Sequence, residues 1–143
     1  MPDRVGQQLG NYRLLRLLGR GGQASVYLGE HVYLKRRAAL KVLHTSLEDE
    51  AVEQFLAEAQ TLARLDHPHI VRVSDFAVEG GTPFLVMDYA PRGTFRTLHP
   101  PGTCLSLEAT ITYTRQVAAA LQYAHNYQAV SYTHLTLPTK RIV

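Results

Sequence analysis

Short apolar runs, punctuated by glycines and charged residues, open the chain and predict three β-strands. They occupy residues 12–18, 25–31 and 38–43. In the third run, a period-two pattern places Lys41 on the same face as Ala39 and Leu43, while Leu40 and Val42 fall on the opposite face. A glycine-rich turn joins the first two runs, as expected for a hairpin.

The pattern changes to a helical period over residues 47–65. Apolar residues recur three or four positions apart, at Val52, Phe55, Leu56, Ala59, Leu62, Ala63 and Leu65. The acids Glu48, Asp49 and Glu50 crowd the expected first turn, where the helix dipole favours negative charge. Residues 66–69 end the predicted helix.

Two more strands are predicted at 70–76 and 83–88, joined by a turn at Gly80–Gly81, and helices follow at 93–98 and 107–126. Ser106 is a suitable N-cap for the last helix. Its expected apolar stripe contains Ile111, Val117, Leu121 and Ala124. The order predicts an α+β fold, in which a five-stranded antiparallel sheet with one packed helix leads into a helical second lobe.

Composition narrows the class of protein. The 143 residues are 45% hydrophobic and 19% charged, which fits a globular chain with one modest core. The net charge of +3 is small and scattered, so nucleic acid is not an expected partner. One cysteine, Cys104, excludes an intrachain disulfide and suits a reducing cytoplasm. The sequence shows neither a signal peptide nor a membrane-spanning run, so we expect a cytoplasmic domain, whose full-length form could have a membrane anchor further on.

The glycine-rich segment Gly19–Val26 admits three interpretations. A P-loop requires a Gly-Lys-Ser/Thr sequence opening a helix, and no such lysine follows. A dinucleotide fingerprint also opens a helix, whereas residues 26–28 continue as strand. A hairpin loop over the phosphates of a nucleoside triphosphate fits both the turn and the strand that follows.

Lys41 and Glu58 support the third interpretation together. Lys41 shares a strand face with apolar residues, which by itself fits either a solvated edge or a phosphate ligand. Glu58 falls inside the apolar arc of its helix, between Phe55 and Leu62. A carboxylate on a buried face is costly unless it is paired. A pair between Lys41 and Glu58 would satisfy both charges.

These features, in this order, resemble the N-terminal half of bacterial serine/threonine protein kinases of the eukaryotic-like type. The resemblance covers about Leu9 to Gln128 and rests on Gly19–Val26, Ala39–Lys41, Glu58, His67–Val71 and Leu85–Ala90. It implies a kinase N-lobe with its hinge at 9–90, after a tail at 1–8, and the start of a helical C-lobe at 91–128. It also implies ATP and Mg²⁺ as cofactors and proteins as substrates.

The resemblance further implies roles for individual residues. Lys41, held by Glu58, would bind the α- and β-phosphates. Leu18, Val26 and Ala39 would sandwich the adenine, and Met87 would be the gatekeeper. The hinge backbone, at Asp88 and Ala90, would meet the purine edge. The implied ATP site comprises Leu18, Gly19, Arg20, Gly21, Gly22, Gln23, Ala24, Ser25, Val26, Ala39, Lys41, Met87, Asp88, Tyr89 and Ala90. Ala24 departs from the family, which most often has glycine there, and predicts a slightly stiffer loop.

Two other candidates are interpreted as structural. Asp75-Phe76 looks like the start of the family's magnesium-binding Asp-Phe-Gly, but Ala77 follows and the segment is a predicted strand. His67 and His69 flank a proline in a turn, and we predict no metal site there.

The family pattern stops after residue 126. Residues 130–135, Val-Ser-Tyr-Thr-His-Leu, resemble the in-frame translation of a transposase adapter used for sequencing libraries, so we interpret 129–143 as a non-native tail. The family's catalytic base, magnesium ligands and activation segment do not occur in the sequence. We therefore expect a truncated serine/threonine kinase whose 143-residue chain is inactive. The alternatives are a pseudokinase or nucleotide-binding scaffold, and a naturally truncated binding domain.

Overall fold

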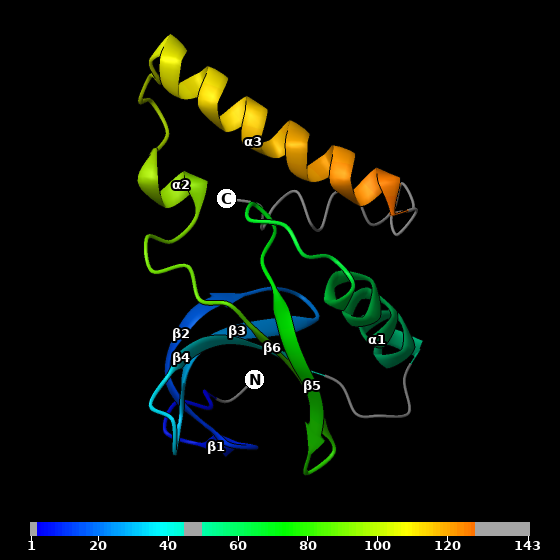
Figure 1. Ribbon diagram of the computed structural model, residues 1–143. Helices are drawn as coiled ribbons and strands as arrows, with labels where there is room; N and C mark the ends of the chain where they lie inside the picture. The colour runs from blue at the N-terminus through cyan, green and yellow to red at the C-terminus, as the bar shows by residue number, and fades with distance from the viewer. Residues whose placement is uncertain (1–2, 45–49, 128–143) are drawn as a thin grey trace. The chain divides into compact units, whose positions relative to one another are not determined.

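Six strands form one antiparallel sheet in the order β1-β2-β3-β4-β6-β5 (Figure 1). This computed structural model describes residues 3–44 and 50–127. The strands are β1 (Gln8–Leu9), β2 (Tyr12–Arg20), β3 (Ala24–His31), β4 (Arg37–Leu43), β5 (Val73–Glu79) and β6 (Thr82–Met87). The helices are α1 (Glu50–Ala63), α2 (Phe95–Leu98) and α3 (Leu107–Asn126).

The described residues divide into two compact units. The first contains the chain up to Ala63 together with Val73–Tyr89, and the second contains Arg64–Arg72 together with the chain from Ala90 onward. The predicted α+β fold with five antiparallel strands and one packed helix is confirmed in the first unit, where α1 contacts β5. The two-residue strand β1 was not predicted, and it adds a sixth strand at the edge beside β2.

One face of the sheet builds the main apolar core. Its buried members are Leu9, Leu14, Tyr27, Ala38, Leu40, Val42, Phe84 and Val86. Leu40 and Val42 alternate with Lys41 along β4, so the predicted period-two pattern separates the core face from the face that carries Lys41. The core face therefore fixes the orientation of Lys41.

Helix α1 presents a second set of buried side chains. These are Val52, Phe55, Glu58, Ala59 and Leu62. Their three- and four-residue spacing gives the helix one buried side, and Glu50 and Glu53 lie in its first turn. The predicted helix began at residue 47, but residues 47–49 lie outside the part of the chain that the structure describes.

The second unit contains the loop 64–72 and helices α2 and α3. The backbone N–H of Asp66 donates a 2.9 Å hydrogen bond to the hydroxyl of Tyr123 on α3. The predicted N-cap is confirmed, because the Ser106 hydroxyl accepts a 3.1 Å hydrogen bond from the N–H of Ala109. Only Ala120 and Ala124 of α3 are buried, and Ile111 is 42% exposed, so the predicted apolar stripe is only partly covered in this unit. Within residues 3–44 and 50–127, no helix is long and apolar enough to cross a bilayer.

Gly29 in β3 has less room for a side chain than any other glycine in the described residues. A Cβ built there would overlap Leu40 Cδ1 and lie 3.5 Å from the Arg13 carbonyl oxygen. Because Leu40 is fully buried, we expect Gly29→Ala to lower the free energy of unfolding by about 1–3 kcal/mol. Urea denaturation followed by circular dichroism measures the change, since the chain has no tryptophan.

Gly22→Ala is the matched control for this overpacking. A Cβ at Gly22 meets no atom within 4 Å, and the residue is exposed. We expect its effect to stay within about 0.5 kcal/mol. Equal losses for the two substitutions would show that close packing does not explain the glycine at position 29.

Candidate functional site

The glycine-rich segment forms the predicted hairpin turn between β2 and β3. Strand β2 ends at Arg20 and β3 begins at Ala24. The N–H of Gly21 donates a 2.8 Å hydrogen bond to the carbonyl oxygen of Ala24 and closes the turn. The side of the turn away from the sheet is open, because Gly21, Gly22 and Gln23 are all exposed.

The glycines of this turn are not required by the fold itself. Gly19, Gly21 and Gly22 do not have the positive φ angles that favour glycine, unlike Gly80 and Gly81 in the β5–β6 turn. A Cβ at Gly19 or Gly22 would meet nothing within 4 Å. The turn therefore presents bare backbone on its open side, and the fold does not itself require glycine there.

The strand register brings four predicted site residues onto one face of the sheet. Val26 of β3 pairs with Lys41 of β4, and Gly19 of β2 pairs with Val26. In the next row, Ala39 pairs with Met87 of β6. Directly paired residues share a face, so Val26, Ala39, Lys41 and Met87 line the face opposite the main core. Lys41 lies two strands from Gly19 in the same row, about 10 Å away at ordinary strand spacing.

Lys41 and Glu58 form the predicted ion pair. The distance between Lys41 Nζ and Glu58 Oε1 is 3.6 Å, and the two side chains are only 13% and 11% exposed. Helix α1 holds Glu58 on its buried side, and β4 holds Lys41 next to the core residues Leu40 and Val42. Each of the two charged side chains is held by an element of the fold and faces the other, so the ion pair fixes the position of Lys41 Nζ on this face.

Phe55, whose sequence position predicts only a place on the apolar stripe of the helix, is a neighbour of Lys41. The Lys41 ammonium lies 5.6 Å from the centroid of the Phe55 ring, within the range of a cation–π interaction. Phe55 lies one turn before Glu58 on α1, and its ring contacts Phe76 of β5, with centroids 6.0 Å apart. Lys41 is therefore positioned by both an anion and an aromatic ring.

Two residues of the predicted ATP site, Leu18 and Ser25, are not paired in the cross-strand rows that contain Lys41 and Ala39. Leu18 lies at a register shift of β2, between the pairs made by Leu17 and Gly19, and is half-buried. Ser25 pairs with Val42, on the core face. The Ser25 side chain is 2% exposed, and its hydroxyl lies 2.7 Å from His44 Nε2. The Ser25 hydroxyl thus lies on the face opposite Lys41, and only its backbone borders the turn.

The predicted hinge residues follow the end of β6. Met87 is buried, Asp88 is exposed, and Ala90 begins the second unit. The Tyr89 hydroxyl accepts a 3.1 Å hydrogen bond from Arg16 Nη2 of β2. Arg16 was not singled out from the sequence. It pairs with Leu28, which pairs with Ala39, so the hydrogen bond joins Tyr89 to a residue on the same face of the sheet as Lys41.

The two segments interpreted above as structural, Asp75-Phe76 and the turn at His67–His69, make contacts within the fold. Asp75 and Phe76 lie in β5 and pair with β6. His67 Nδ1 accepts a 3.1 Å hydrogen bond from the N–H of His69, within the turn. No group of three or more His, Cys, Asp or Glu side chains that could hold a metal ion occurs in the described part of the chain.

A model of the protein kinase domain family matches residues 12–135 of the chain. Among curated proteins, the chain is 40% identical over 126 residues to serine/threonine-protein kinase Pkn1 of Myxococcus xanthus. It is 33% identical over 129 residues to serine/threonine-protein kinase PrkC of Bacillus subtilis. Among solved structures, it superposes on the PknI kinase domain of Mycobacterium tuberculosis with a TM-score of 0.70 and 30% identity.

These similarities cover most of the chain but a small part of the curated relatives. The alignments include 85% of the chain for Pkn1 and 88% for PrkC, but 18% and 20% of those proteins. The superposition on PknI covers 89% of the chain and 54% of that kinase domain. The family match extends to residue 135 and so enters the segment 129–143 that was interpreted above as non-native. This segment lies outside the residues that the structure describes, and its origin stays a prediction.

Proposed function

This chain belongs to the protein kinase family, among the bacterial serine/threonine kinases of the eukaryotic-like type, and on that premise we propose that its first unit binds ATP. The reaction would be transfer of the γ-phosphoryl group of Mg-ATP to serine or threonine hydroxyls of proteins. The observation that carries the proposal is the nearly buried Lys41–Glu58 ion pair, in the same cross-strand row as Gly19 of the open turn.

Each group on this face has a distinct task in the proposed site. The Lys41 ammonium neutralises the α- and β-phosphates, and Glu58 and Phe55 hold it in place. The exposed turn 19–24 allows its backbone to approach the phosphates, because Gly19 and Gly22 present no side chain. Val26 and Ala39 offer an apolar surface for the adenine ring, beside Met87.

Mg²⁺ would accompany ATP in this reaction and neutralise phosphate charge. The described residues do not supply a cluster that could hold it, so the proposal assigns it no ligand among them. The contribution of this unit is binding and orientation of the nucleotide, which accounts for a large part of catalysis in phosphoryl transfer.

An acyl-phosphate derivative of ATP tests the proposal directly. A lysine amine near the phosphates attacks the acyl carbon, and the acyl group moves to the amine as the nucleotide leaves. We expect mass spectrometry to find Lys41 acylated, with excess ATP suppressing the labelling. Lys35, in the exposed β3–β4 turn, is the internal control, and ATP should leave its labelling unchanged. Labelling of Lys41 that ATP does not reduce would contradict the proposed site.

The 143-residue polypeptide itself is expected not to phosphorylate substrates. Its sequence contains no His-Arg-Asp or Asp-Phe-Gly segment, the family's sources of the catalytic base and of a magnesium ligand. Incubation with radiolabelled ATP and a generic protein substrate should therefore give no transfer above the background without protein. Transfer that the Lys41→Met substitution abolishes would refute this expectation.

A further inference from the structure

His44 directly follows β4 and contacts the glycine-rich turn through two groups. Its backbone N–H donates a 2.9 Å hydrogen bond to the carbonyl oxygen of Gln23, inside the turn. Its ring atom Nε2 lies 2.7 Å from the hydroxyl oxygen of Ser25, the second residue of β3. Either neutral tautomer of the imidazole can form this second hydrogen bond, because a hydroxyl can both donate and accept. We call His44, Gln23 and Ser25 the histidine clasp.

The strand register explains why the members of the histidine clasp meet. Ser25 pairs directly with Val42, so its side chain lies on the core face. The hydrogen bond from His44 to Gln23 continues the β3–β4 ladder one residue beyond the pair of Leu43 with Ala24. The alternation of faces therefore extends to His44, which lies on the same face as Val42 and diagonally across from Ser25. The histidine clasp thus lies on the face opposite Lys41 and leaves the proposed nucleotide face open.

The hydrogen bond between His44 and Ser25 is shielded from water at its Ser25 end. Ser25 is 2% exposed, and its cross-strand neighbour Val42 is 1% exposed, whereas His44 is half-buried. A buried hydroxyl is costly to leave without a partner, and a low local dielectric strengthens the hydrogen bond that it forms. We therefore expect this contact to hold the start of β3 more firmly than a surface hydrogen bond would.

The glycine-rich turn offers few side chains by which the rest of the fold could hold it. Gly19, Gly21 and Gly22 carry none, and Gln23 is exposed. Glycine has more backbone freedom than other residues, so a glycine-rich segment loses more conformational entropy when a ligand orders it. Contacts that fix the turn before a ligand arrives reduce this cost. The histidine clasp supplies two such contacts at the point where the turn enters β3.

We propose that His44 is a positioning residue, which holds the turn 19–24 in the conformation that binds the phosphates of ATP. This role rests on the proposed function, because it requires the turn to lie over the phosphates. Lys41 is three residues before His44 and on the opposite face, so a single segment would position both the ammonium group and the turn. The alternative is that the histidine clasp only stabilises the pairing of β3 with β4. Its loss would then lower the free energy of unfolding and leave the affinity for ATP unchanged.

Competition with the acyl-phosphate probe measures this role in the 143-residue chain. When the probe is well below its own dissociation constant, the competitor concentration that halves the labelling of Lys41 equals the competitor's dissociation constant. The competitors are ATP and adenosine, with Mg²⁺ present. We expect His44→Ala to raise the dissociation constant of ATP about tenfold, because ordering that a buried hydrogen bond had supplied must then come from the binding energy. Adenosine has no phosphates, and its dissociation constant should stay within about twofold.

Variants at both ends of the hydrogen bond test the contact itself. His44→Gln keeps an amide group near the position of Nε2 and should restore most of the lost affinity for ATP. Ser25→Ala removes the other partner, and we expect it to weaken ATP binding about as much as His44→Ala does. The double variant Ser25→Ala/His44→Ala should be no weaker than His44→Ala alone, because both substitutions remove the same contact. If His44→Ala does not fold, Ser25→Ala carries the same comparison of ATP with adenosine.

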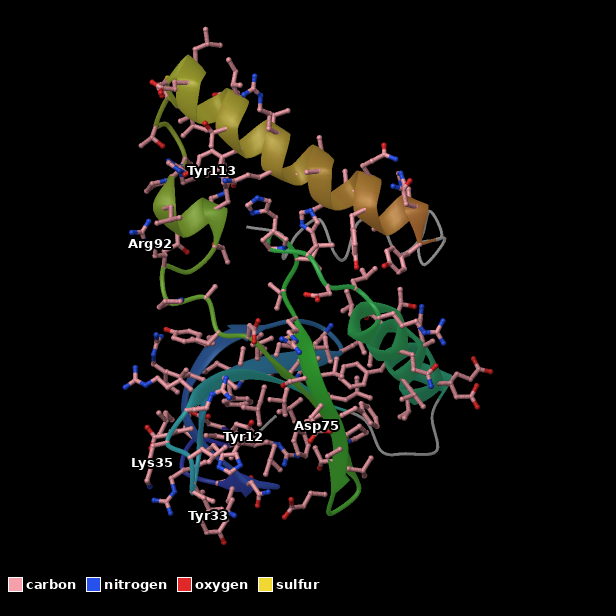
Figure 2. All side chains as sticks on the ribbon, viewed as in Figure 1. Tyr12, Tyr33, Lys35, Asp75, Arg92 and Tyr113 are labelled. Carbon is pink, nitrogen blue, oxygen red and sulfur yellow. The ribbon has the colours of Figure 1, made fainter. Side chains whose placement is uncertain are left out.

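The opposite end of β3 provides the matched control. His31 is also half-buried, and its Nδ1 accepts hydrogen bonds from the N–H groups of Tyr33 and Leu34, at 3.2 and 3.0 Å. Figure 2 shows Tyr33 at the outer edge of the sheet. His31→Ala removes a hydrogen-bonded imidazole at a turn that contains no residue of the proposed site, so it should leave the dissociation constant of ATP within about twofold. Circular dichroism during urea denaturation shows whether each variant is folded.

Four results would overturn the inference. The first is protection of Lys41 by ATP that is equally strong in the unsubstituted chain, His44→Ala and Ser25→Ala, in which case the proposed function would stand without this role for His44. The second is an equal loss for ATP and adenosine, and the third is an equal loss for His44→Ala and His31→Ala. Either would identify a general structural effect. The fourth is labelling of Lys41 in the unsubstituted chain that ATP does not reduce, which would remove the proposed function together with this role.

Discussion

Replacing Lys41 with methionine should nearly abolish phosphoryl transfer in a version of this protein that carries the rest of the kinase domain. Methionine keeps the unbranched apolar stem but removes the ammonium group that Glu58 holds 3.6 Å away. The proposed phosphate contacts and their charge neutralisation are lost together. We expect kcat/KM for ATP to fall on the order of 10²- to 10³-fold, as for the loss of one preorganised charge-stabilising group. Initial rates with radiolabelled ATP at several concentrations measure the loss.

Arg64→Met is the control for this substitution. Arg64 is an exposed cation directly after α1, and its replacement also removes one positive charge and leaves methionine. Its rates should stay within about twofold of the unsubstituted enzyme. If Lys41→Met were no more damaging than Arg64→Met, Lys41 could not bind the phosphates, whatever its position in the fold.

The sequence was sufficient to predict the Lys41–Glu58 pair, but not which residues of the neighbouring strands share a face with Lys41. Two local patterns led to the Lys41–Glu58 pair: the alternation along residues 38–43 and a carboxylate inside the apolar arc of a helix. Both patterns depend only on how side chains are spaced along one element. The structure adds the cross-strand register, which aligns Lys41 with Val26 and Gly19. Register depends on long-range pairing, so it could be expected only through the resemblance to a family.

Strand boundaries were less predictable, as β5 shows. Three apolar residues, Ile70, Val71 and Val73, suggested a strand from 70 to 76, whereas β5 spans Val73–Glu79. Ile70 instead belongs to a turn, in which its N–H bonds to the carbonyl of His67 at 3.1 Å. The strand extends to Glu79 because Gly80 and Gly81, both with positive φ, make a two-residue turn that pairs Glu79 with Thr82. The strand predicted from local hydrophobicity therefore begins and ends three residues before β5 does. The C-terminal end of β5 is set by the geometry of the Gly80–Gly81 turn.

Two other features had no signal in the sequence. Strand β1 is two residues long, too short for any period, and it forms because the chain reverses at Gly10, where φ is positive. The contact between Lys41 and Phe55 joins residues on different elements, and a phenylalanine on an apolar stripe looks the same whether it meets leucine or an ammonium group. Only the packing of α1 against the sheet distinguishes the two.

Replacing Glu58 with glutamine should lower phosphoryl transfer by about 10- to 100-fold, the range expected when a catalytic group is misplaced by about 1 Å. Glutamine keeps the shape of the side chain but removes its charge, so the nearly buried Lys41 ammonium loses its anion. Phe55 still contacts Lys41, which is why the expected loss is smaller than for Lys41→Met. Because the ammonium group remains, we expect kcat to fall more than the affinity for ATP.

Glu53→Gln makes the same chemical change on the same helix, at an exposed position, and should have no measurable effect on the rate. The double variant Lys41→Met/Glu58→Gln then tests whether Glu58 acts through Lys41. If it does, the double variant should be no slower than Lys41→Met alone, because the group that Glu58 positions is already absent. Multiplicative losses would mean that Glu58 acts independently, and the ion pair would then not explain why a carboxylate occupies the buried side of α1.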